Sequence, residues 1–208
     1  MMKKFLLNAR KNILNKIKYG ADTSLLKYVN KDFRKDRKFM LDAVKLNGFT
    51  LEFASNELKK NKEIVYEAVK RNAGSLRYAD KSLKKDRDFI FKILKKNHNV
   101  LEVLDSSLKK DKKFILKAVK LFGTFLAYAN KSLRKDKTVV LEAVKTQGVA
   151  LEYADKSLRK NKKIVLVAVK QYGNAIEYAD KNLRKDIKIK LEASKSMKRW
   201  KKKFSKAY

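Results

Sequence analysis

Apolar residues recur along this chain with a period of 25 residues, and the period runs through seven copies without an insertion. We number each copy from a repeating aliphatic residue, which is position 0. Position 7 is Leu in six copies and position 17 is Ala in six copies. Such a fixed period is typical of a solenoid, in which each unit buries its apolar face by stacking on its neighbours. The position 0 residues are Leu26, Leu51, Leu76, Leu101, Leu126, Leu151 and Ile176.

Each copy predicts two helices. Position 10 is always Asp or Asn, whose short side chain can cap the free N–H groups of a first helical turn. The run that follows, such as residues 137–145, has apolar spacings of one, three and four, which predicts a largely buried helix. Gly at position 22 in four copies predicts a left-handed helix end. A shorter helix is predicted over residues 149–154, with an inter-helix loop at residues 155–160.

The two ends of the chain depart from the repeat. We expect a capping helix over residues 1–25, tandem repeats over 26–197 and a basic, aromatic tail over 198–208. A membrane-surface helix or a targeting peptide is the alternative for the first segment, because its basic residues accompany an apolar face. No run approaches the roughly 18 apolar residues of a membrane span. The apolar face comprises Met2, Phe5, Leu6, Ala9, Ile13 and Ile17.

The stretch "AVKTQGVALEYADKSLRKNKKIVLVAVKQYGNAIEYADKNLRKD" contains the pattern AVK–x–x–G–x–A–L–x–Y–A followed by L–R–x–D. It resembles a short helical repeat that occurs in tandem in bacterial, protist and giant-virus proteins and is classed as a domain of unknown function. The resemblance covers residues 26 to 197. It implies an all-α fold, an α-solenoid of about seven 25-residue helix–loop–helix repeats, and it offers no catalytic motif.

Composition removes several kinds of chemistry. The chain has no Cys, so disulfides, thiolate catalysis and Cys-ligated metals are excluded. Its single histidine, His98, occupies a predicted turn, and no glycine-rich phosphate loop or metal-ligand spacing is present. Tyr at position 2 is expected to form a packed stripe rather than a base-stacking platform. We therefore expect a protein that is not an enzyme and uses no cofactor or metal.

Positive charge is the remaining signal. Lys and Arg number 55 against 22 Asp and Glu, a net charge of +33. This excess is far beyond what solubility requires and indicates a polyanionic partner. Positions 8 and 9 are basic in every copy, position 5 is Lys in five and position 11 is Lys or Arg in six. We expect all four positions to lie in the loop and to line one edge of the solenoid as a ridge. The residues at positions 8 and 9 are expected to bind nucleic-acid phosphates: Arg34, Lys35, Lys59, Lys60, Lys84, Lys85, Lys109, Lys110, Arg134, Lys135, Arg159, Lys160, Arg184 and Lys185.

The tail adds Arg199, Trp200 and Lys201, a basic and aromatic group that suits nucleic acid and slightly favours RNA over DNA. Other readings stay open: another polyanion, an anionic membrane surface, or a protein partner on the concave face. The Lys excess also fits the drift of a low-GC genome. We expect an intracellular location, cytoplasmic, or organellar or in a virion if the first helix is a targeting element.

Overall fold

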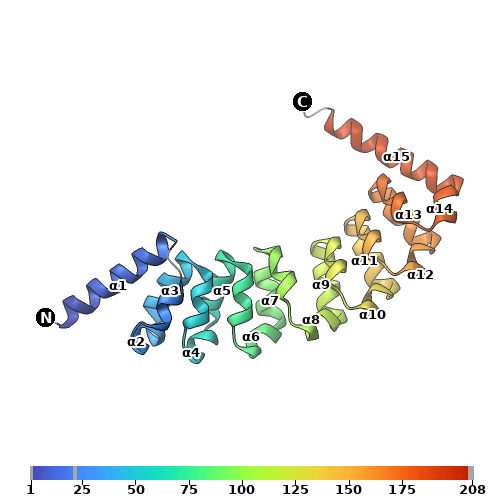
Figure 1. Ribbon diagram of the computed structural model, residues 1–208. Helices are drawn as coiled ribbons and strands as arrows, with labels where there is room; N and C mark the ends of the chain where they lie inside the picture. Colours follow the sequence, from blue (N-terminus) through green and yellow to red (C-terminus); the bar gives the residue numbers. More distant parts are fainter. Residues whose placement is uncertain (1, 21–22, 206–208) are drawn as a thin grey trace. The chain divides into compact units, whose positions relative to one another are not determined.

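The structure is a computed structural model that describes residues 2–20 and 23–205; of residues 2–6, 203 and 204 it describes the backbone alone (Figure 1). The apolar face expected for Met2, Phe5 and Leu6 therefore falls on side chains outside the described set. All described elements are helical. The chain divides into two units, residues 1–105 and 106–208, and each is built from the same repeat.

The first unit begins with one long helix and continues with repeats of three helical segments. In each complete repeat a short α-helix leads to a longer one, and a 3-10 helix follows. The elements are α1 (Met2–Lys18), η1 (Thr23–Lys27), α2 (Lys31–Lys35), α3 (Arg37–Leu46), η2 (Gly48–Phe53), α4 (Asn56–Lys59), α5 (Lys62–Arg71), η3 (Ala73–Tyr78), α6 (Lys81–Lys85), α7 (Arg87–Leu94) and η4 (His98–Val103).

The second unit repeats this order and ends in one long helix. The elements are α8 (Ser106–Lys110), α9 (Lys112–Leu121), η5 (Gly123–Tyr128), α10 (Lys131–Arg134), α11 (Lys137–Thr146), η6 (Gly148–Tyr153), α12 (Lys156–Arg159), α13 (Lys162–Gln171), η7 (Gly173–Tyr178), α14 (Lys181–Lys185) and α15 (Ile187–Phe204). Within each unit the longer helices pack side by side and successive 3-10 helices contact one another. The predicted fold class, an all-α solenoid of tandem helical repeats, is confirmed.

Stacking of the longer helices builds the core. In α11, Val139, Val140, Ala143 and Val144 are all fully buried. These positions lie on two neighbouring stripes of the helix, so the helix is covered by a neighbour on each side. Full burial of a Val side chain contributes about 1.5–3 kcal/mol, so the stack stabilises each repeat mainly through its neighbours.

The predicted position 10 caps are confirmed. The Asp136 carboxylate accepts the backbone N–H groups of Thr138 and Val139 at 2.9 and 3.1 Å, and Asn161 accepts that of Ile164 at 3.2 Å. The same contact starts every longer helix of the repeats. Because each cap lies at the same repeat position, each longer helix begins in the same register.

The predicted second helix and loop are wrong in detail. Residues 149–154 fall largely in the 3-10 helix η6, and the predicted loop at 155–160 contains the α-helix α12. The sequence signal for α12 is Asp155 at position 4, whose carboxylate accepts the Ser157 backbone N–H at 3.0 Å as an N-cap. Each repeat therefore has three helical segments rather than two.

The predicted left-handed glycine at position 22 is also wrong. Gly20 alone among the described residues has a positive φ, and Gly148 has none. A Cβ on Gly148 would instead collide with the carbonyl oxygen of Ala168, at position 17 of the next repeat. Gly48, Gly123 and Gly173 meet Ala68, Ala143 and Ala193 in the same way. At these four boundaries glycine at position 22 lets the backbone touch a carbonyl of the next repeat, whereas Ala73 and His98 occupy the same position in two other copies.

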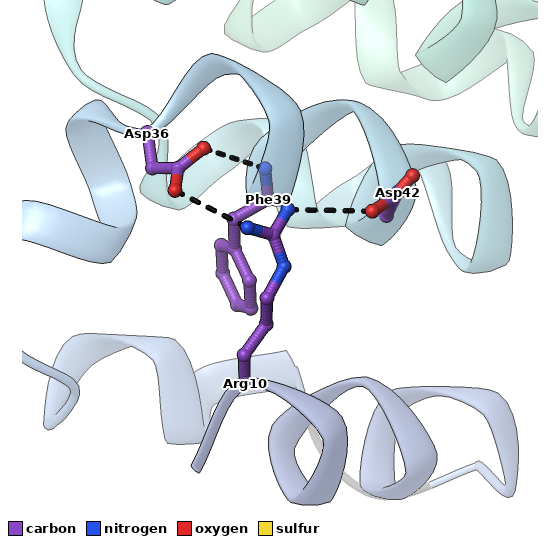
Figure 2. A network of polar contacts seen from close by, with 4 residues as sticks. All are labelled: Arg10, Asp36, Phe39 and Asp42. Atoms are coloured by element: carbon purple, nitrogen blue, oxygen red, sulfur yellow. Dashed lines mark hydrogen bonds and ion pairs between the residues drawn. The ribbon is translucent and has the colours of Figure 1, made fainter. Parts of the chain in front are cut away.

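Helix α1 packs against α3 through Arg10 (Figure 2). The guanidinium of Arg10 donates to the carboxylates of Asp36 and Asp42, each at 3.3 Å, and lies 5.6 Å from the centre of the Phe39 ring. The side chain of Arg10 is 19% exposed. Asp36 also caps α3 by accepting the Phe39 backbone N–H at 2.8 Å. Arg10 therefore connects α1 to the N-cap of α3, Asp36, and to Asp42 in the second turn of α3.

Candidate nucleic-acid interface

In five of the seven repeats the short helical segment carries two exposed lysines, at positions 5 and 9. The Asp80 carboxylate starts α6 by accepting the Ser82 backbone N–H at 2.9 Å and the Ser82 hydroxyl at 2.6 Å. Lys81 and Lys85, at positions 5 and 9, then follow one turn apart, and both are exposed. Residues four apart share a face of a helix. The same exposed pairs are Lys31 with Lys35, Lys131 with Lys135, Lys156 with Lys160, and Lys181 with Lys185.

Position 9 is exposed in all seven copies: Lys35, Lys60, Lys85, Lys110, Lys135, Lys160 and Lys185. Of these seven lysines, Lys135 forms an ion pair within the described part of the chain: its Nζ lies 4.0 Å from Asp155 Oδ2. The Lys135 side chain is nevertheless 63% exposed. Asp155 is the position 4 cap of the next repeat. Hydrogen bonds from the Ser157 backbone and hydroxyl hold the pKa of Asp155 below its usual value, with Lys135 adding to the effect.

Position 8 differs from position 9, because it is half-buried in six of the seven copies. The Arg34 side chain donates from Nε to the Phe53 carbonyl oxygen at 2.8 Å, and the Arg34 carbonyl accepts the Ser55 N–H at 2.9 Å. Both acceptor and donor belong to the next repeat. The backbone bond recurs from Asp80 to Lys59, Asn130 to Lys109, Asp155 to Arg134 and Asp180 to Arg159. Position 8 therefore joins successive repeats, whereas position 9 faces solvent.

Two position 8 cations in the first unit influence each other. Partial burial lowers the pKa of Lys59, and the positive charge of Arg34 lowers it further. These residues occupy the same position in consecutive repeats. The stacking therefore holds like charges close together and creates a positive potential beside the exposed lysines.

Position 11 does not belong to the predicted ridge. Lys112 and Lys162 start the longer helices, and their Nζ atoms lie 2.6 Å from Oδ2 of Asp136 and Asp186, the caps of the following helices. Lys62 lies 2.8 Å from Asp86 in the same arrangement. These cations are neutralised between repeats and are structural.

Position 19 forms a second row of seven exposed lysines, but acids accompany it. Lys70 lies 3.3 Å from Glu67, and Lys145 lies 2.7 Å from Glu142 on the same helix. Lys195 has the same partner in Glu192 at 3.5 Å. In these copies a carboxylate three residues earlier reduces the net positive charge of the row, whereas Lys92, Lys117 and Val167 occupy that place in three other copies.

The packed stripe expected of the position 2 tyrosines is wrong for Tyr28, which is 87% exposed. Tyr78 and Tyr153 are half-buried in the stacks of their units. Burial raises the pKa of both phenols, and the nearby carboxylates of Glu52 and Glu152 raise it further. Negative charge beside these rings disfavours an approaching phosphate, which agrees with a packing role.

The predicted tail continues the last helix. Helix α15 runs from Ile187 to Phe204 without a break at residue 198. Arg199 donates from Nη2 to the Lys170 carbonyl oxygen at 3.2 Å, and the Trp200 side chain is 56% exposed. The next residue, Lys201, is also exposed. The aromatic and basic group is thus held on a helix that packs against α13.

Within the described part of the chain, no helix is long and apolar enough to cross a bilayer, and no group of three or more His, Cys, Asp or Glu residues forms a potential metal site.

Comparison with known proteins identifies the repeat. A family described as Domain of unknown function (DUF4116) matches residues 13–59, 61–109, 86–134, 111–159, 136–184 and 161–198. No curated protein and no solved structure matches the chain. Overlapping matches one repeat apart confirm the tandem organisation expected from the sequence. The chain therefore belongs to the DUF4116 family of helical repeats.

Proposed function

We propose that the protein is a non-catalytic nucleic-acid-binding repeat protein that contacts the phosphate backbone through the lysines at positions 5 and 9. It acts inside the cell, in the cytoplasm or in an organelle or virion. RNA is slightly favoured over DNA because of the aromatic and basic group around Trp200.

The lysine pairs on the short helices carry the proposal. Like charges four residues apart on a helix cost about 0.2–0.5 kcal/mol, and burial returns nothing for exposed side chains. Lys81 and Lys85 are the first and last residues of α6, and Lys156 starts α12 while Lys160 is its C-cap, in a right-handed helical conformation. A repeated arrangement that lowers stability without a packing gain supports a role in binding polyanions.

The lack of variety at these positions indicates contact with phosphates rather than bases. Reading a base sequence needs different hydrogen-bonding side chains at successive positions. Position 9 is Lys in every copy. We therefore expect strong salt dependence and weak sequence preference.

The carboxylates support a non-catalytic role. A hydrogen bond from Lys62 holds the pKa of Asp86 below its usual value, and one from Lys162 does so for Asp186. A general acid or base near neutral pH needs a carboxyl pKa shifted upward. Asp86 and Asp186 cap the longer helices and form ion pairs with lysines of the preceding repeat.

The test compares two matched variants, each with seven Lys→Gln changes. One changes position 9 in every copy. The other changes position 19 in six copies and keeps Lys170, which lies beside Arg199 and Trp200; Lys117, an exposed lysine of α9, replaces it as the seventh change. The changed residues of this control are Lys45, Lys70, Lys95, Lys117, Lys120, Lys145 and Lys195. Both lose the same charge, so a difference between them reports placement. Binding of labelled single-stranded RNA, single-stranded DNA and duplexes is measured by fluorescence anisotropy across salt concentrations.

We expect the position 9 variant to lose most of its affinity, and its log–log salt slope to fall by up to about 5 units at about 0.7 per phosphate contact. The position 19 variant should lose less. Equal losses would reject the proposed surface. Wild-type protein that binds no nucleic acid at about 0.15 M salt would reject the function and favour a protein partner.

A further inference from the structure

A cavity of about 380 Å³ lies in the second unit between the end of α13, the start of η7 and the middle of α15. Its lining includes Lys170, Tyr172, Asn174, Arg199, Trp200 and Lys201. No lining residue is acidic, three are basic and two are aromatic. The lining thus combines flat apolar surfaces with positive charge.

A difference in sequence between the last repeat and the two before it accounts for this cavity. At the previous boundaries of the unit, an amide side chain from the following repeat covers the start of the 3-10 helix. Gln147 Oε1 accepts the Thr124 N–H at 3.0 Å, and Gln171 Oε1 accepts the Gly148 N–H. In the last copy the same two repeat positions hold Ser196, one repeat after Gln171, and Met197, two repeats after Gln147.

Neither residue can replace the amide. The Ser196 hydroxyl donates to the Lys170 carbonyl oxygen at 3.2 Å, on the α13 side of the boundary. Met197 offers a thioether, which is a weak acceptor. Both residues line the cavity. The last repeat therefore lacks the amide side chain that bridges the two earlier boundaries, and the cavity lies in its place.

The cations at this recess are partly fixed in place. Arg199 and Ser196 donate to the same carbonyl oxygen, that of Lys170, each at 3.2 Å. This bond orients the guanidinium beside the cavity. Trp200 follows directly on α15 and keeps 56% of its surface exposed. An indole, a guanidinium and two lysines around one recess match a planar aromatic ring joined to phosphate.

We propose that this cavity takes one unstacked base of a single-stranded nucleic acid, which stacks on Trp200 while Lys170, Arg199 and Lys201 hold the adjoining phosphates. The inference rests on the proposed function and adds to it a preference for single strands. A duplex keeps its bases paired and stacked, so it can supply phosphates but no base to the cavity.

Trp200 is the sole tryptophan of the chain, so its fluorescence reports on the cavity. The full-length protein is titrated with a short single-stranded RNA, with an abasic strand of the same length, with a duplex and with vesicles of anionic phospholipid. We expect the RNA to quench the emission and the abasic strand to leave it nearly unchanged. Equal quenching by both strands would overturn the proposal.

Two variants test the stacking by anisotropy with labelled strands. Trp200→Leu should weaken single-strand binding roughly 5- to 150-fold, the range for one stacked base, and leave binding of the abasic strand unchanged. Tyr28→Leu removes an aromatic side chain that is 87% exposed and outside the cavity, and should have no effect. Circular dichroism checks that both variants keep the helical fold.

The two proposals fail in different ways. If wild-type protein binds RNA with a steep salt slope and Trp200→Leu binds equally well, the cavity assignment alone is wrong. If no strand binds at about 0.15 M salt, both proposals are wrong. A change in Trp200 emission with vesicles but not with strands would reject both and indicate a membrane surface.

Discussion

Lys162 Nζ lies 2.6 Å from Asp186 Oδ2, while Asp186 Oδ1 accepts the backbone N–H of Ile189 at 3.1 Å. One carboxylate therefore caps its own helix and pairs with the preceding repeat. The same double contact occurs at Asp136, with Lys112 and Val139. Basic residues of the repeat thus have two roles: Lys62, Lys112 and Lys162 at position 11 pair with the cap of the next repeat, and the lysines at position 9 are exposed.

The two contacts of Asp136 can be separated by substitution. Asp136→Ala removes both and should lower the free energy of unfolding by about 0.5–2 kcal/mol. Asp136→Asn keeps the cap, as the natural Asn161 does at the same position, and should cost less than about 1 kcal/mol. Urea unfolding measures both values. An Asn variant as unstable as the Ala variant would show that the ion pair, not the cap, dominates.

Stability should fall in acid. Hydrogen bonds from Lys62 and Lys162 hold the pKa values of Asp86 and Asp186 below those of the unfolded chain. A lowered carboxyl pKa contributes stability that is fully present above the unfolded value of about 3.9 and is lost as pH falls through the folded value. Thermal unfolding should therefore be nearly independent of pH from about 7 to 5 and drop below about pH 4. A Tm that rises in this acid range would contradict the assignment.

Gly148→Ala tests the backbone contact between repeats. The added methyl would meet the Ala168 carbonyl oxygen, which belongs to a buried helix and cannot move aside. We expect a loss of about 1–3 kcal/mol in the free energy of unfolding. Gly74→Ala is the matched control, because its methyl meets the edge of the Phe49 ring at 3.2 Å, and that side chain can rotate. The control should change stability by less than about 1 kcal/mol.

Arg10→Gln should loosen α1 from α3. The substitution removes both ion pairs, with Asp36 and Asp42, and the contact over the Phe39 ring. Amide hydrogen exchange in α1 should accelerate, while exchange in the repeats of the second unit stays the same. Lys11→Gln changes an exposed neighbour and is the control. Unchanged exchange in α1 of the Arg10 variant would show that apolar packing alone holds this helix.

The sequence predicts the repeat, the fold class and the position 10 caps because each depends on local chemistry repeated seven times. It predicts the short helix as a loop, because a cap such as Asp155 before a single turn gives little periodicity. The reason for glycine at position 22 depends on a carbonyl 20 residues later, as for Gly148 and Ala168. Spacing alone offers no sign of that contact.

The sequence does not distinguish position 8 from position 9 on the candidate surface. Adjacent basic residues such as Arg34 and Lys35 look equivalent in a sequence, yet one is half-buried and the other exposed. The difference arises because the two side chains point in different directions from a helix of about one turn. A loop, which the sequence predicts here, has no such fixed directions. The recess beside Trp200 depends on the absence of an amide at Ser196 and Met197, and the bridging role of the amides of Gln147 and Gln171 follows from tertiary contacts that spacing does not indicate.

The contact between Gly148 and the Ala168 carbonyl also sets the distance between two successive repeats. Two backbones that touch leave no slack, and neither do the hydrogen bonds from Asp155 to Arg134 and from Asp180 to Arg159. Within the second unit the pitch of the repeat is therefore rigid, and the position 9 lysines are spaced by the protein alone. A polyanion that follows them must adjust its own phosphate spacing, which a flexible strand does at less expense than a stiff duplex.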